Sequence, residues 1–283
     1  MIAYKHEAYI RQAIESILSQ EVDFPIELVI GDDCSPDGTA AICEDFARRD
    51  PRVRLLPRGQ NLGVMPNFTR TLLACTGDYI AVCEGDDYWT DPQKLRKQVR
   101  FLDSHPDHTG TTHQSMVITN NLPLRVFKEN VPATLVTSDL IGGRLFHMAS
   151  VMFRRPAIEL FSNGPLVLGC DRLLNFCISF LGKIHYSEEC MCAYRLHAGG
   201  MSSNATVSQM RLELNSIPYL AQIQPSFPKY RYLSYVYAAI GLSRAARWDQ
   251  KIYYLTLSFF YSFSSFPRNL IVFGSRLLRG IYS

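Results

Sequence analysis

The sequence predicts an α/β fold in which a mostly parallel, doubly wound sheet is followed by a helical appendage. Short apolar runs alternate with longer stretches of helical periodicity over residues 1–105. Two of these runs end in paired acidic residues, which is typical of loops that leave the carboxyl ends of strands in an open α/β sheet. We expect strands near residues 26–31, 53–56, 79–84 and 111–118, and helices near residues 8–20, 39–49, 66–75 and 92–105.

Composition agrees with one ample core and an appendage. The chain has 283 residues, of which 47% are hydrophobic, and a formal net charge of +3. Charged residues interrupt the first 20 residues, so we expect no secretory leader. The eight cysteines show no paired CxxC spacing, and most of them are expected to be buried thiols of a cytoplasmic protein.

Residues 205–283 differ from residues 1–204, and we expect a domain boundary between them. The tail has nine basic residues against two acidic ones and is rich in aromatic residues. Its longest uncharged run, 252–267, is too short to span a bilayer. An apolar face at Leu270, Phe273, Leu277 and Ile281 predicts a helix that lies on an anionic membrane.

Two other interpretations of the tail stay open: a helical hairpin packed on the rest of the chain, or a dimer contact. Nucleic acid is not an expected partner, because the basic residues accompany apolar faces instead of forming an exposed basic stripe.

The segment after the run 79–82 is the most informative part of the chain. Glu84, Asp86 and Asp87 follow that apolar strand within four residues. Such a cluster is costly unless a cation or a hydrogen-bonding ligand is bound there. Carboxylate oxygens suit Mg²⁺ or Mn²⁺, which commonly bind together with a phosphate-bearing substrate. The alternative is a solvated turn followed by a helix cap.

A second acidic pair favours the ligand-binding interpretation. Asp32 and Asp33 follow the apolar run 25–31, before a turn and a helix. Because ligands of open α/β sheets lie outside the carboxyl ends of the strands, both acidic groups are expected at one shared site. One group would accept hydrogen bonds from a base and a ribose, and the other would hold the metal.

At this point the sequence resembles family 2 glycosyltransferases, which use nucleotide-sugars and have the GT-A fold. The motifs occur in the family's order, which is far more specific than a lone acidic pair. The resemblance is strong for residues 4–105, the nucleotide-binding half, and weaker for residues 106–204, the acceptor half. The matching segments are Tyr4–Ile10, Ala13–Gln20, Gly31–Thr39, Asn61–Gly63 and Glu84–Asp87.

The resemblance implies roles for these residues. Asp33, with Asp32, would accept hydrogen bonds from the nucleobase, and Asp86 would bind Mn²⁺ or Mg²⁺. Glu84 stands where the family usually has an aspartate, so its contact with ribose or metal-bound water follows less directly. The implied nucleotide-sugar-binding residues are Tyr4, Glu7, Asp32, Asp33, Asn61, Glu84, Gly85, Asp86 and Arg195.

The second half carries two more motifs. Gly169–Asp171 resembles the motif that supplies the catalytic base, so Asp171 would take the proton of the acceptor hydroxyl. Asp171 could instead be a first-turn acid of the helix 172–181. Tyr194–His197 resembles a motif near the diphosphate and metal, which makes His197 a candidate metal ligand, although it could be a simple loop residue. His147 is expected on a strand near 147–154, where a satisfied core histidine is favoured over a residue that faces the acceptor.

The amino-terminal segment departs from the family. Only Met1–Ala3 precede Tyr4, where the family has a complete buried strand, and Lys5 replaces the usual asparagine. A shortened inner strand is expected to leave unpaired backbone groups and an open apolar slot. Two hypotheses follow: the true start lies upstream, or the chain is a truncated member.

The resemblance therefore implies a metal-dependent enzyme that moves one sugar from a nucleotide-sugar, a UDP-sugar, with inversion. The acceptor would be a hydroxyl of a surface glycan or a lipid-linked oligosaccharide at the inner face of the plasma membrane. Two other classes stay open: a nucleotidyltransferase acting on sugar phosphates, and a catalytically inactive scaffold.

Overall fold

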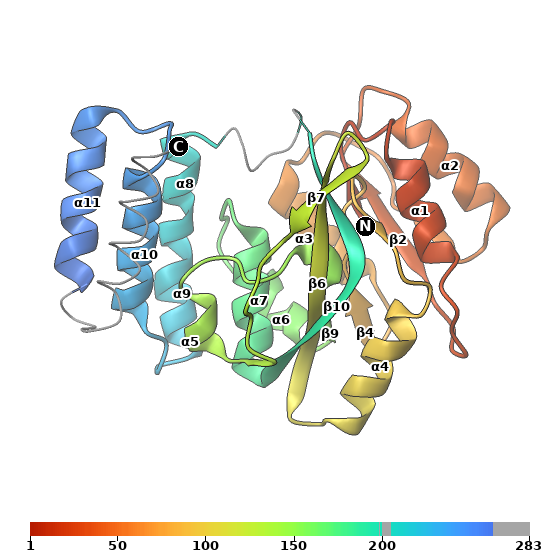
Figure 1. Ribbon diagram of the computed structural model, residues 1–283. Coiled ribbons are helices and arrows are strands. Elements are labelled where there is room, and N and C mark those ends of the chain that lie inside the picture. Colours follow the sequence, from red (N-terminus) through yellow and green to blue (C-terminus); the bar gives the residue numbers. More distant parts are fainter. Residues whose placement is uncertain (198, 200–204, 263–283) are drawn as a thin grey trace. The chain divides into compact units, whose positions relative to one another are not determined.

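A computed structural model describes residues 1–197, 199 and 205–262 (Figure 1). The chain divides into two compact units, each described here by itself. Unit 1 comprises Met1–Val136, Arg144–Asn163 and Cys177–Ala198, and unit 2 comprises Thr137–Gly143, Gly164–Phe176 and Gly199–Ser283. Unit 2 thus contains two segments that precede residue 204 in the sequence. The apolar face predicted at residues 270–281 lies outside the described residues.

A parallel three-stranded sheet forms the amino-terminal part of unit 1. Its strands are β1 (Ile2–Ala3), β2 (Leu28–Asp32) and β3 (Val53–Leu55), in that order. All five residues of β2 are buried, as expected of an inner parallel strand with both faces covered. The helices that alternate with these strands are α1 (Ile10–Leu18), α2 (Thr39–Arg49) and α3 (Val64–Ala74).

A larger mixed sheet forms the rest of unit 1, with the strand order β4-β9-β6-β10-β5. The long strands β6 and β10 run parallel to each other, whereas the other pairs in this sheet are antiparallel. A two-residue turn with positive φ at Asn120 and Asn121 explains the β6–β7 hairpin. The mixed α/β fold is therefore confirmed, with parallel pairing in the first sheet and mostly antiparallel pairing in the second. Its strands are β4 (Tyr79–Ala81), β5 (Tyr88–Trp89), β6 (His108–Thr119), β7 (Leu122–Val126), β8 (Thr134–Leu135), β9 (Met152–Arg154) and β10 (Lys183–Leu196).

The short strand β1 has backbone hydrogen bonds to a neighbouring segment on each of its two sides. The Asp33 N–H donates to the Ala3 carbonyl at 2.9 Å, and the Gly85 N–H donates to the Ile2 carbonyl at 3.0 Å. Ala3 is buried in the core. Strand β1 thus joins β2 to the loop that follows β4, and both loops that carry acidic motifs leave the same edge.

One expected strand is interrupted. Residues 147–154 form the 3₁₀ helix η1 (Met148–Ser150) followed by β9, instead of one continuous strand. His147 precedes η1, and its Nδ1 atom accepts a hydrogen bond from the Ala149 N–H at 3.3 Å. The prediction that His147 lies on a strand is therefore wrong, because its side chain caps a helical turn.

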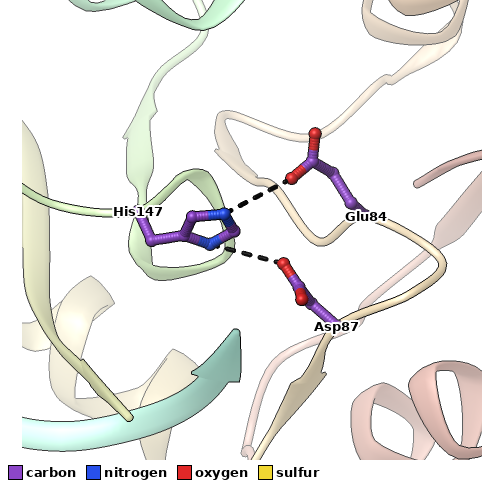
Figure 2. A group of neighbouring side chains, drawn as sticks. All are labelled: Glu84, Asp87 and His147. Atoms are coloured by element: carbon purple, nitrogen blue, oxygen red, sulfur yellow. Dashed lines mark ion pairs between the residues drawn. The ribbon is translucent and has the colours of Figure 1, made fainter. Parts of the chain in front are cut away.

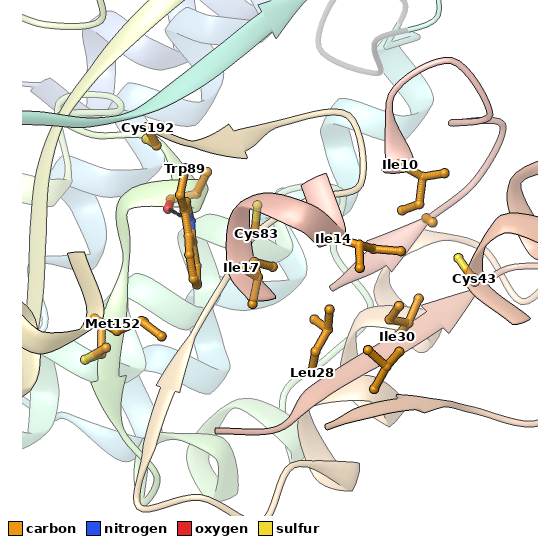
Figure 3. Close-up of a cluster of buried hydrophobic side chains, with 14 of the residues drawn as sticks. Ile10, Ile14, Ile17, Leu28, Ile30, Cys43, Cys83, Trp89, Met152 and Cys192 are labelled. Carbon is orange, nitrogen blue, oxygen red and sulfur yellow. Dashed lines mark hydrogen bonds between the residues drawn. The ribbon is translucent and has the colours of Figure 1, made fainter. Parts of the chain in front are cut away.

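The core of unit 1 lies between α1 and the two sheets (Figure 3). Ile10, Ile14 and Ile17 occur at helical spacing and form the buried face of α1. They pack with Leu28 and Ile30 of β2. Trp89 of β5 belongs to the same cluster and donates its indole N–H to the Ala149 carbonyl at 2.9 Å.

Helix α4 (Lys94–Ser104) brings an unusual group into this core. Lys94 is fully buried, with its Nζ 2.8 Å from Gln98 Oε1 and 4.1 Å from the centre of the Trp89 ring. Burial lowers the pKa of Lys94 to about 8. The folded state therefore holds the proton of this lysine less tightly than the unfolded chain does.

The remaining helices belong mainly to unit 2, and an edge-to-face group of Phe176, Phe227 and Tyr232 is buried among them. None of the helices within the described residues is long and apolar enough to cross a membrane. Helix α7 begins in unit 2 and continues into unit 1, and α6 lies in unit 1. These helices are α5 (Thr137–Leu140), α6 (Ala157–Ser162), α7 (Cys170–Leu181), α8 (Val207–Arg211), η3 (Leu212–Asn215), α9 (Ser216–Ile223), α10 (Lys229–Gly241) and α11 (Trp248–Ser262).

Lys94 makes the stability of the fold depend on pH in a defined window. Between pH 8 and the ordinary lysine pKa of about 10.4, the unfolded chain binds a proton that the folded chain does not. This group therefore contributes a rise of about 3 kcal/mol in the free energy of unfolding across that window. We expect Lys94→Met to remove this contribution, measured by urea unfolding at pH 8 to 10.5.

The matched control for this change is Lys128→Met, because Lys128 is exposed and lies outside the core. The control should follow the wild-type pH profile. Identical profiles of unfolding free energy against pH for Lys94→Met and the wild type would contradict the lowered pKa of Lys94. Cysteines and tyrosines also titrate in this window, but their contribution cancels when the two proteins are compared.

Candidate active site

The acidic loop that follows β4 packs directly on β1 and α1. A Cβ atom at Gly85 would lie 2.7 Å from Ile10 Cδ1 and 2.9 Å from His6 Nδ1. Contacts this short require a neighbouring side chain to shift, so glycine is the residue that fits here without displacement. The close packing fixes the backbone that presents Glu84 and Asp86.

Asp86 lies between two histidines from distant parts of the sequence. Its Oδ2 atom is 3.1 Å from His197 Nε2 and 3.6 Å from His6 Nε2. Burial lowers the pKa of His6, and the nearby Asp86 opposes this effect in part. The structure thus brings Asp86 and His197 together as the sequence analysis expected, and adds His6, which that analysis missed. His6 could have been noticed because it lies within the first motif, two residues after Tyr4.

Arg195 joins the acidic loop to β10. Its Nη1 atom donates to the Asp86 carbonyl at 2.7 Å, and its Nη2 atom donates to Gln12 Oε1. The guanidinium lies over the rings of Tyr9 and Tyr88, at 5.1 and 4.7 Å from their centres. Because these hydrogen-bond acceptors are neutral, Arg195 brings a positive charge close to the acidic loop.

Asp87 is buried, and its carboxylate contacts both Arg195 and His147. Its Oδ1 atom accepts the backbone N–H of Arg195 at 2.9 Å. Its Oδ2 atom lies 3.3 Å from His147 Nδ1 but has no hydrogen-bond partner among the described residues. Burial raises the pKa of Asp87 well above its ordinary value, and the charges of Asp86 and Glu84 raise it further.

Figure 2 shows that the two ring nitrogens of His147 face different carboxylates. Nδ1 faces Asp87, and Nε2 lies 3.7 Å from Glu84 Oε2. Because Nδ1 accepts the Ala149 N–H, it and Asp87 Oδ2 are two acceptors that need a proton or a cation between them. His147 is buried, as the core interpretation expected, but it also belongs to the polar site.

Two groups of residues have the chemistry of a divalent cation site. Ligand atoms of Glu84, Asp87 and His147 lie within 4.8 Å of one another, and the orphaned Asp87 oxygen fits a cation. Asp86 and His197 form the other group. Carboxylate oxygens suit Mg²⁺ and Mn²⁺, whereas imidazole nitrogens suit later transition metals, so both groups fit Mn²⁺ at least as well as Mg²⁺.

The first acidic pair, Asp32 and Asp33, binds residues of the loops near the end of β2. Asp32 accepts hydrogen bonds from Ser35 and lies 3.1 Å from Arg58 Nε. The two Asp33 oxygens accept the backbone N–H groups of Leu62 and Gly63, at 2.8 and 2.9 Å. The side chain of Asn61 donates to the Asp33 carbonyl at 2.8 Å. Asn61 therefore lies beside Asp33, and base recognition by these aspartates stays a prediction.

The first motif, Tyr4–Ile10, is hydrogen-bonded to the turn before α2. Glu7 Oε2 accepts the Gly38 N–H at 3.0 Å, and Lys5 donates its backbone N–H to Ser35 Oγ at 3.0 Å. Lys5 has a φ of 60°, a conformation that glycine and asparagine adopt more readily than lysine. Tyr4 is exposed beside this turn, and the Lys5 Nζ atom lies 5.1 Å from the centre of its ring.

Asp171 belongs to unit 2, in the first turn of α7. The preceding Gly169 donates its N–H to Glu213 Oε2 at 3.2 Å, and Glu213 also accepts the Tyr232 hydroxyl. Burial raises the pKa of Glu213, while Arg172 opposes that effect. Sequence reasoning missed Glu213, although it is one of only two acidic residues in the basic tail. The role of Asp171 as a base stays a prediction.

The packing around Gly85 gives a testable expectation. We expect Gly85→Ala to lower the free energy of unfolding by about 1 to 3 kcal/mol, because the added methyl group must displace Ile10, His6 or Ala3. Urea denaturation measures this change. Gly142→Ala is the matched control, since a Cβ atom there would meet nothing within 4 Å. Equal stability of the two variants would refute the packing argument.

The chain has recognisable relatives. Residues 1–159 match the family described as Glycosyl transferase family 2. Over 212 residues the chain is 36% identical to an uncharacterized protein of Mycobacterium tuberculosis, covering 72% of this chain and 60% of that protein. It is 27% identical over 203 residues to a putative teichuronic acid biosynthesis glycosyltransferase of Bacillus subtilis, covering 71% and 79%. The chain thus spans only 60% of the length of the mycobacterial relative.

Solved structures share the fold. S. aureus TarS 1–349 in complex with UDP-GlcNAc matches with a TM-score of 0.67 and 18% identity, covering 90% of this chain and 77% of that one. A mannosyltransferase from Pyrobaculum calidifontis, in complex with GDP-Man and Mn²⁺, matches with a TM-score of 0.57 and 15% identity, covering 98% and 78%. Because the family match extends over more than half of the chain, this chain belongs to glycosyltransferase family 2, and its fold is the GT-A fold.

Proposed function

We propose that the chain transfers one sugar from a UDP-sugar to a hydroxyl group of a cell-envelope glycan or a lipid-linked oligosaccharide. The observation that carries this proposal is the convergence of Asp86, Arg195 and His197 on one side of the acidic loop. Carboxylate, guanidinium and imidazole groups at one place suit a diphosphate with its cation.

Asp86 and His197 would hold the divalent cation, with His6 beside them. The cation would stabilise the negative charge of the leaving nucleoside diphosphate. Arg195 would contribute a second positive charge toward the same diphosphate, held in place by Gln12 and the Asp86 carbonyl. The Mn²⁺ and GDP-Man bound to the P. calidifontis enzyme, and the UDP-GlcNAc bound to TarS, support a nucleotide-sugar and a cation as ligands of this fold.

The nucleoside would lie toward the end of β2. There Asp33 and Asn61 already meet, and Tyr4 is exposed. Each oxygen of Asp33 has one hydrogen bond to the backbone, and a carboxylate oxygen can accept a second bond from a base. Glu84 would reach the ribose or a metal-bound water, in keeping with its place at the edge of the acidic loop.

Asp171 would take the proton of the acceptor hydroxyl as that oxygen attacks the sugar in a single inverting displacement. Nearby negative charge also favours an oxocarbenium-like transition state. Support comes from its motif and from the buried hydrogen bond between Gly169 and Glu213, which fixes the turn that carries Asp171.

The acceptor and the cellular location are inferred from the relatives and the tail. The B. subtilis relative is named for teichuronic acid biosynthesis, and another relative for minor teichoic acid biosynthesis, both of which concern the cell envelope. The excess of basic residues in 205–283 suits work at the anionic inner face of the plasma membrane.

Metal-dependent nucleotide binding tests the site around Asp86. We expect one of UDP, GDP, CDP and dTDP to raise the melting temperature in the presence of Mn²⁺ but not of EDTA, with UDP as the expected nucleotide. Asp86→Ala should abolish the rise, because it removes the carboxylate that both histidines face. Asp23→Ala, at an exposed acid outside the site, is the control and should keep it. A full Mn²⁺-dependent rise in Asp86→Ala would rule out this metal assignment.

The proposed base is tested by separating binding from turnover. Asp171→Asn should keep the nucleotide-induced melting shift and lose transfer by at least about 100-fold, since the amide cannot accept the proton. Release of nucleoside diphosphate from a nucleotide-sugar, with an acceptor present, measures transfer, whereas pyrophosphate release would indicate a nucleotidyltransferase. Asp139→Asn, another acid in the first turn of a helix, should leave transfer unchanged. Unimpaired transfer by Asp171→Asn would overturn the assignment.

A further inference from the structure

Helix α11 presents a stripe of large apolar side chains to solvent. Trp248 is 80% exposed and Phe260 70%, and Ile252, Tyr253 and Phe259 are also exposed. Successive residues of a helix are rotated by about 100°, so these five side chains fall within an arc of about 140°. They are five of the fifteen large hydrophobic side chains that are exposed in the described part of the chain. A concentration of this kind on one short helix indicates an interaction surface.

The opposite face of α11 is already occupied by α10. Ser258 Oγ donates to the Ser234 carbonyl at 2.8 Å, and Ser234 Oγ lies 2.9 Å from the Ser258 carbonyl. A Cβ atom at Gly241 would lie 2.9 Å from Leu255 Cγ, so the two helices approach closely there. These contacts fix the rotation of α11 within unit 2. The exposed stripe is therefore the face that points away from α10.

The segment of the chain that contains this stripe has an excess of basic residues. Residues 205–283 contain nine basic residues and two acidic ones. Of the two, Asp249 pairs with Arg247 at 2.8 Å, and Glu213 is bound within unit 2 by Gly169 and Tyr232. Beyond Asp249 the sequence contains four basic residues and no acidic one. The partner of the stripe must therefore accept both apolar side chains and positive charge.

An anionic lipid bilayer meets both conditions. A second copy of this chain would bring one basic segment close to another, which opposes association through this face. Helix α11 has 15 residues, and no helix in the described residues is long and apolar enough to span a membrane. Trp and other aromatic side chains partition to the headgroup–acyl boundary, with basic residues toward the phosphates.

We propose that α11 is the surface by which the chain lies on an anionic membrane, with Trp248, Ile252, Phe259 and Phe260 inserted at the headgroup boundary. This inference rests on the proposed function in one respect: the proposed acceptor gives the enzyme a reason to be at a membrane. Lipid binding itself requires no substrate. The surface would keep the enzyme close to a lipid-linked or membrane-proximal acceptor.

Co-sedimentation of the full chain with vesicles, without nucleotide or acceptor, tests the proposal. We expect binding to phosphatidylcholine vesicles that contain about 30% phosphatidylglycerol, and little binding to pure phosphatidylcholine. The double variant Trp248→Ser and Phe260→Ser should weaken the partition coefficient at least about tenfold. Both side chains are largely exposed, so the fold should survive, as circular dichroism and the melting temperature would verify.

The matched control is the double variant Leu122→Ser and Leu124→Ser, which changes two exposed apolar residues of β7 in unit 1. It should bind vesicles like the wild type. Unchanged binding by the α11 variant, or no binding by the wild type, would overturn the proposal. A wild-type dimer in light scattering that the α11 variant converts to monomer, without vesicle binding, would assign the stripe to a second copy instead. If a chain that ends at residue 262 binds vesicles and the full chain does not, residues 263–283 would be the occupant of the stripe instead.

Loss of lipid binding and failure of the catalytic proposal are distinguishable. Donor binding, measured as the Mn²⁺-dependent melting shift, should be the same in the α11 variant and the wild type. A variant that loses vesicle binding but keeps the nucleotide shift supports the surface independently of the reaction.

Discussion

The buried carboxylate of Asp87 is the constraint on which the candidate site depends. One oxygen accepts the backbone N–H of Arg195, and the other faces His147, so three segments distant in sequence meet at one side chain. A buried carboxylate is costly in isolation, and the strongly raised pKa of Asp87 reflects that cost. The arrangement is stable only when a proton or a cation lies between Asp87 and His147.

The two acidic motifs perform different physical work. Asp32 and Asp33 bind backbone amides and an arginine, and so they shape the loops at the end of β2. Among the described residues, the Oδ2 atom of Asp86, in contrast, faces the imidazole groups of His6 and His197, which leaves it suited to a cation. Carboxylates of one residue type thus serve as structural anchors in one loop and as candidate ligands in the other. The difference arises from whether backbone N–H groups or side-chain nitrogens surround them.

The distribution of charge separates the two ends of the chain. Residues 205–283 carry a large excess of basic residues, although the whole chain has a formal net charge of only +3, so the rest of the chain is acidic overall. An acidic region near the candidate metal site favours cations, and a basic tail favours anionic surfaces. The exposed stripe of α11 adds apolar area to that basic region. Chemistry and attachment would then be assigned to different parts of one chain.

The sequence by itself determined the α/β class, the alternating elements of the first 105 residues and the acidic strand ends, because apolar periodicity and paired carboxylates are local signals. It also placed Asp86 and His197 in two motifs that the fold brings together, with 3.1 Å between Asp86 Oδ2 and His197 Nε2. Only the tertiary structure decided that His6 faces Asp86, that His147 caps a 3₁₀ turn between two carboxylates, and that Asp33 binds the loop at Leu62. It also decided the mostly antiparallel pairing of the second sheet and the burial of Lys94. These features depend on contacts between residues far apart in the chain, which no local pattern encodes.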